Sequence, residues 1–157
     1  MIYQGAIILA LGLDLILGLA IFVPNPRRVV NLLFFLLSIL IALWLGTNIG
    51  ILATGDPAWA ARHIRAAGAV AAFTPVLCQM LRMASADPHI GVGGLVRRSW
   101  PMLALGLLVG AACFTPWHVR EVRMPAWGSP DVEEPVYGPF FPVYVVYFLA
   151  QVVGIFV

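Results

Sequence analysis

Charged residues are scarce in this sequence, and lysine is absent altogether. Only 10% of the 157 residues are charged, while 62% are hydrophobic. A soluble domain typically has about 25% charged and about 45–50% apolar residues. A water-soluble fold of this length could not bury so much apolar surface. The composition therefore excludes a soluble catalytic domain and predicts an integral membrane protein with about five transmembrane helices.

Cysteine and the usual metal-binding patterns are also rare. Cys78 and Cys113 fall inside apolar segments, which predicts reduced packing residues and no disulfide. His63, His89 and His118 have no histidine or cysteine at ligand spacing, so we expect no metal site and place His63 and His118 on an exposed outer surface.

Catalytic motifs are missing as well. The sequence has no Walker loop, no G-x-S-x-G, no H-E-x-x-H and no paired carboxylates inside an apolar segment. The nine arginines stand in short clusters between apolar runs, and the net charge is only +2. We therefore expect no enzyme activity, no cofactor and no nucleic-acid partner.

Apolar runs long enough to be membrane spans dominate what is present. A hydrocarbon core of about 30 Å needs about 20 helical residues. The first run does not resemble a signal peptide, because no basic residue precedes it and Asp14 interrupts it. We predict an all-α membrane bundle, a single transmembrane domain over 1–157, with helices at about 2–23, 29–53, 60–84, 100–116 and 139–157.

Two polar stretches separate the later helices. Residues 85–99 contain three glycines and Arg97-Arg98, which predicts a short solvent-exposed connector. The stretch from Trp117 to Gly138 is longer. Its alternation at 118–124 indicates a short strand and its Trp-Gly-Ser-Pro at 127–130 a turn, so this loop is predicted to hold a short hairpin.

The arginines indicate an orientation. Arginine-rich short loops favour the cytoplasmic side. If each segment crosses once, one side carries the pairs Arg27-Arg28 and Arg97-Arg98 together with Arg82. The other side carries the four remaining arginines. We therefore predict a multi-pass protein of the bacterial cytoplasmic (inner) membrane, with the N-terminus and the loop 117–138 outside.

Small and polar residues form a stripe along each predicted helix. Polar side chains are costly in a bilayer core and should face protein or a wet cavity. Asp14 shares a face with Ala6, Ala10 and Gly18, since these are spaced by four. The second helix has a similar stripe at Ser38, Ala42, Gly46 and Gly50, and such small residues allow close helix approach.

The polar positions beside these stripes are the candidate ligand-binding residues. We predict a shared interior in the centre or outer half of the bundle, with Trp127 and Tyr137 of the external loop as a lid. The alternative is that these polar groups only link helices or fill the core. The candidates are Asp14, Trp44, Asn48, Gln79, Tyr144 and Tyr147.

Three features resemble the N-terminal seven-helix sensor region of bacterial histidine kinases. One is the N-P-R-R turn at 25–28. Another is the run N-L-L-F-F-L-L-S-I-L-I-A-L-W-L-G-T-N at 31–48, followed by an Ala-rich helix with Pro75. The third is Y-G-P-F-F-P-V-Y at 137–144. The resemblance implies a sensory input module that feeds a cytoplasmic output domain, often through a PAS domain, in a kinase or a diguanylate cyclase.

The chain departs from that family in two ways, because it has five predicted helices and no output domain. We therefore expect its gene to continue into two more helices and a soluble domain. The expected partners are the lipid bilayer and that cytoplasmic domain, and a homodimer is left open. Two alternatives stay open for the function: a small transporter or channel subunit with Asp14 on its path, or a structural membrane subunit.

Overall fold

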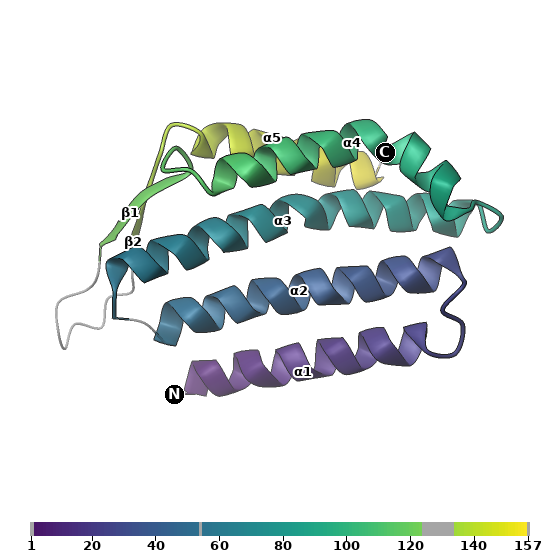
Figure 1. The fold of residues 1–157 in the computed structure, drawn as a ribbon, viewed down its shortest axis with the longest axis horizontal. Coiled ribbons are helices and arrows are strands. Elements are labelled where there is room, and N and C mark those ends of the chain that lie inside the picture. The colour runs from purple at the N-terminus through teal and green to yellow at the C-terminus, as the bar shows by residue number, and fades with distance from the viewer. Residues whose placement is uncertain (1, 54, 124–133, 157) are drawn as a thin grey trace.

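Five helices and one two-stranded sheet make up the described part of the chain (Figure 1). The structure is a computed structural model, and it describes residues 2–53, 55–123 and 134–156. The elements are α1 (Ile2–Phe22), α2 (Val29–Ala53), α3 (Pro57–Ala86), α4 (Val92–Cys113), β1 (Val119–Arg123), β2 (Glu134–Tyr137) and α5 (Phe141–Phe156).

The first two helices agree with the predicted segments to within one residue. Helix α3 is longer than predicted at both ends. It begins at Pro57 because the Asp56 side chain accepts a hydrogen bond from the Ala58 amide (2.9 Å) and caps the helix, and proline at the first helical position needs no amide partner. By length and composition α1 to α4 could each cross a membrane, whereas α5 has only 16 residues.

The predicted connector at 85–99 is wrong for most of its length, because α4 already begins at Val92. Gly91 is the N-cap of α4, a position at which glycine is among the preferred residues. Leu95 and Ser99, one turn apart, are both buried. Pro101 lies inside α4, and the first part of this helix lies at an angle to the rest in Figure 1.

The helices form a row, and α3 is its centre (Figure 1). Helix α1 packs on α2, α2 packs on α3, and both α4 and α5 pack on the far side of α3. The buried residues follow this arrangement in three clusters. One joins Leu33 to α3 and α4, one joins α3 to α4 and α5, and one joins the start of α3 to the hairpin.

The strands β1 and β2 pair antiparallel, which confirms the predicted hairpin. The register opposes Val119 to Tyr137 and Arg123 to Glu134, with an irregularity between Val119 and Glu121. Val119 and Val122 are buried against the first turns of α3. The predicted turn at 127–130 and the lid residue Trp127 lie outside the described residues.

Candidate functional site

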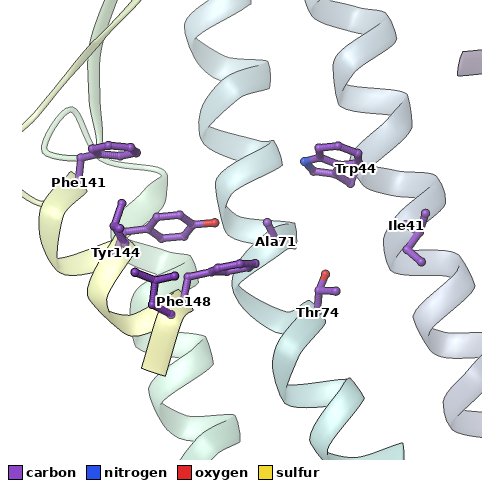
Figure 2. A pocket seen from close by; sticks show the side chains of 9 residues that line it. Ile41, Trp44, Ala71, Thr74, Phe141, Tyr144 and Phe148 are labelled. Atoms are coloured by element: carbon purple, nitrogen blue, oxygen red, sulfur yellow. The ribbon is translucent and has the colours of Figure 1, made fainter. Parts of the chain in front are cut away.

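A groove of about 470 Å³ opens between α2, α3 and α5. Figure 2 shows Trp44 reaching in from α2 and Tyr144 and Phe148 from α5, with Ala71 and Thr74 of α3 between them. The short side chains of Ala71 and Thr74 leave the space that the aromatic rings enclose. The remaining lining residues are Ile41, Phe141, Val145 and Leu149.

Aromatic rings in contact form the α5 wall of this groove. The ring centroids of Phe141 and Tyr144 are 6.4 Å apart and those of Tyr144 and Phe148 are 6.3 Å apart, each pair stacked. Tyr137 at the end of β2 stacks on Phe141 with centroids 3.7 Å apart. Such pairs contribute about 0.5–1.5 kcal/mol each beyond the area they bury. The wall is therefore continuous with the hairpin.

His118 holds this wall against the other helices. It is only 3% exposed, so the expectation of an exposed His118 is wrong. Its ring packs edge-on against Tyr144, with centroids 4.9 Å apart. The ring also packs against Gly68 of α3, where an added Cβ would lie only 2.6 Å from the His118 Nε2. The sequence hid this burial because the glycine that accommodates the ring lies 50 positions away.

The charge state of His118 follows from that position. Burial lowers the pKa of the imidazole below its ordinary value, and the positive charge of Arg65 lowers it further. The ring of Tyr144 contacts the imidazole, and the Sγ of Cys113 lies beside Gly68, as the His118 Nε2 does. Its Nδ1 has no hydrogen-bond partner among the described residues. The ring is therefore neutral at neutral pH and acts as a packing element.

Arg65 fastens the hairpin to α3. Its guanidinium donates to the Val119 carbonyl from Nε (3.0 Å) and from Nη2 (2.7 Å), and Nη2 also lies 3.2 Å from the Arg120 carbonyl. Charge-assisted hydrogen bonds of this kind are about twice as strong as neutral ones. The first turns of α3, the hairpin and the start of α5 are thus one connected unit.

Gln79 and Tyr147, two predicted site residues, link α3 to α5. The Gln79 amide donates to the Gln151 carbonyl (2.9 Å), and the Tyr147 hydroxyl donates to the Ala72 carbonyl (2.8 Å). Both side chains are buried. Tyr147 lies next to the part of α3 where Pro75 removes a backbone donor. Neither residue lines the groove.

Asp14 and Asn48 lie elsewhere. Asp14 is at the interface of α1 and α2, where it shares a hydrogen bond with the Ser38 side chain and its Oδ2 is buried without a partner among the described residues. Asn48 donates to the Trp44 carbonyl of its own helix (2.7 Å) and makes no cross-helix bond in the described structure.

Of the six predicted residues, the structure therefore brings only Trp44 and Tyr144 together at the groove. The expected interior shared by all six does not form, because the helices lie in a row and α2 and α3 separate Asp14 from α5. The predicted ligand-binding role of the six residues stays a prediction. Sequence reasoning missed Ala71, Thr74 and Phe148 as lining residues, and the Ala-rich run of α3 was the available signal for a hollow.

The chain matches no known protein family, no curated protein and no solved structure. The resemblance to the sensor region of histidine kinases therefore stays an expectation from the sequence.

Proposed function

We propose that this chain is a multi-pass membrane receptor module that binds an apolar, ring-bearing small molecule in the groove between α2, α3 and α5. The observation that carries the proposal is the groove itself, whose volume falls within the range of about 300–1,000 Å³ typical of small-molecule sites. Aromatic rings line two of its sides, and its polar groups are the hydroxyls of Thr74 and Tyr144 and the indole N–H of Trp44.

Membrane placement is supported by the outer surface of the bundle. Large apolar side chains on α1 are more than half exposed, among them Leu9 and Ile16 at 64% each. A soluble protein rarely leaves so continuous an apolar face uncovered. Lipid would cover this face, and an α-helix pairs its interior backbone amides and carbonyls within itself, as a bilayer requires.

The charged residues support the orientation proposed from the sequence. The α1–α2 and α3–α4 connections lie at the same end of the helix axes (Figure 1). Five arginines are close to these connections in the chain: Arg27, Arg28, Arg82, Arg97 and Arg98. The hairpin lies at the opposite end. By the positive-inside rule the hairpin faces outward.

Cysteine labelling tests this orientation. We expect a membrane-impermeant maleimide to label Arg123→Cys in intact cells, and Arg98→Cys only after permeabilisation, because these exposed positions lie at opposite ends. The unsubstituted chain gives the background from Cys78 and Cys113, which are partly or fully buried. The reverse labelling pattern would overturn the proposed orientation.

A bound molecule would bridge two helices that both pack on α3. Trp44 belongs to α2, whereas Tyr144 and Phe148 belong to α5. Occupancy would therefore change the spacing between α2 and α5, and tightly packed helices respond to such changes by moving between discrete arrangements. The aromatic wall would carry the movement to the hairpin through Phe141 and Tyr137.

A transporter is less well supported by this arrangement. An ion path should be lined by several ionisable groups. Among the described residues, no carboxylate and no basic side chain lines the groove. Asp14 lies at the α1–α2 interface, on the other side of α2 from α3.

Binding of 2-naphthol, measured by equilibrium dialysis with the full chain in phosphatidylcholine nanodiscs, tests the groove. We expect Trp44→Ala to weaken binding about tenfold, since it removes one ring wall. Tyr144→Phe should reduce the preference for 2-naphthol over naphthalene, because it removes one hydroxyl. Trp100→Ala is the matched control, since Trp100 is an exposed tryptophan on α4 outside the groove. Equal binding by Trp44→Ala and Trp100→Ala would refute the proposed site.

A further inference from the structure

A second pocket, of about 390 Å³, lies near the start of α3 and shares no residue with the groove. Four positions on one face of α3 build it at helical spacing: Trp59, Arg62, His63 and Ala66. Arg65 and Phe114, which follows α4, complete the lining. The pocket thus combines two guanidinium groups and an imidazole with two large aromatic side chains.

The cationic and aromatic groups of this pocket are held in place before any ligand arrives. The Arg62 guanidinium lies over the Trp59 ring, 5.5 Å from its centroid. The His63 Nδ1 donates to the Trp59 carbonyl (2.9 Å), and the ring packs directly on Gly50 of α2. Arg65 is fixed by its bonds to the hairpin. Ordered donors lose less conformational entropy when they bind a ligand.

The charge balance of the pocket favours an anion. None of the lining residues that the structure describes is acidic. Its described lining carries two guanidinium groups, those of Arg62 and Arg65. Arg62 is exposed, and a guanidinium presents a fixed fork of donors that can bind a carboxylate or phosphate through two parallel hydrogen bonds.

The aromatic groups indicate an apolar body attached to that anion. Trp59 is 51% exposed and Phe114 is 61% exposed, and both border the pocket. Large aromatic residues at the end of a membrane bundle typically lie at the level of the lipid headgroups. A molecule with an oxyanion and an apolar chain would place its anion at the arginines and its chain along these rings.

We propose that the pocket of Trp59, Arg62, His63, Arg65, Ala66 and Phe114 binds an oxyanion, carboxylate or phosphate, carried on an apolar chain. The inference uses the membrane placement proposed above and does not depend on the groove. Two sources share this chemistry: the headgroup of an anionic lipid of the surrounding bilayer, and a free anionic amphiphile.

Equilibrium dialysis of hexyl phosphate against the full chain in phosphatidylcholine nanodiscs tests the proposal, with empty nanodiscs subtracted. We expect Arg62→Gln to weaken binding about tenfold or more, since a hydrogen bond to a charged group is lost. Arg123→Gln is the matched control. It removes the same charge on the hairpin strand β1, at an exposed position outside the pocket. Hexanol and inorganic phosphate should both bind more weakly than hexyl phosphate to the unsubstituted chain.

Nanodiscs that contain phosphatidylglycerol distinguish the two sources. If Arg62→Gln and the unsubstituted chain bind hexyl phosphate equally in these nanodiscs, the lipid headgroup already occupies the pocket. If the difference persists, a free amphiphile is the occupant, and either result supports the proposal. Equal binding of hexyl phosphate by Arg62→Gln and Arg123→Gln in phosphatidylcholine would overturn it, and so would hexanol or inorganic phosphate binding as tightly as hexyl phosphate. The groove variant Trp44→Ala should bind hexyl phosphate like the unsubstituted chain, so the proposed groove and the proposed pocket are tested independently.

Discussion

Replacing Gly138 by alanine is expected to lower the free energy of unfolding by about 3 kcal/mol or more and to loosen the hairpin from the helices. A Cβ atom at Gly138 would collide with the Trp117 carbonyl and would lie 2.7 Å from the Pro116 carbonyl oxygen. These are backbone atoms, so no side-chain rotation can relieve the contact.

The backbone around Gly138 cannot move away either, because it is bonded on both sides. The Gly138 amide donates to the His118 carbonyl (2.9 Å), and the Phe140 amide donates to the Trp117 carbonyl (2.9 Å). Separating the two segments would break both bonds. It would also pull the start of α5 away from His118, whose ring contacts Phe140 and Phe141.

Hydrogen exchange of the peptide 114–123 in nanodiscs would measure this loosening, and unfolding in mixed SDS micelles would give the loss of stability. Gly93→Ala is the matched control, because among the described residues no neighbouring atom lies within 4 Å of a Cβ added there. It should be neutral or slightly stabilising, since alanine favours a helix more than glycine does. If Gly138→Ala exchanges at the rate of Gly93→Ala, the junction does not depend on this close backbone contact.

The sequence predicted those parts of the fold that depend on local apolar runs and local turns. Helices α1 and α2 follow from long apolar runs, the first of which holds a single charged residue, Asp14, and the hairpin follows from alternation at 118–124. The start of α4 was missed because Gly93, Gly94 and the arginine pair look like a loop when read alone. Leu95 and Ser99 are buried, and Leu95 packs against residues of α3. This packing favours a helix here, and it cannot be read from the neighbouring sequence.

The candidate site was predicted less completely, for a related reason. Helical spacing indicates which residues share a face, but not which helix that face meets. Gly50 was expected to lie in a helix-packing stripe with Gly46. Gly50 instead receives the His63 ring of α3, and a Cβ at Gly46 would meet no atom of another described element within 4 Å. Asp14 and Trp44 were placed in one interior, yet they lie on different interfaces because the helices form a row.

Replacing Gly18 by leucine is expected to separate α1 from α2 and to lower the free energy of unfolding by about 3 kcal/mol. A Cβ at Gly18 would lie 2.7 Å from the Cβ and 2.8 Å from the Oγ of Ser38, which is itself only 2% exposed. A branched side chain cannot fit there unless the helices move apart. The Ser38 hydrogen bond to Asp14, one turn along α1, would then be lost, leaving a carboxyl group exposed in an apolar layer.

Gly12→Leu is the matched control for that separation. It adds the same side chain to the same helix, at a position where a Cβ has no neighbouring atom within 4 Å in the described part of the chain. Helix α1 makes its main packing contact with α2, so its detachment should be visible at the far end of the pair. The Gln4 amide donates to the Leu52 carbonyl there (3.3 Å). A short thiol cross-linker should join Gln4→Cys to Leu52→Cys rapidly in the Gly12→Leu background and slowly in the Gly18→Leu background. Equal cross-linking rates, together with equal unfolding in SDS micelles, would show that α1 and α2 do not rely on close approach at Gly18.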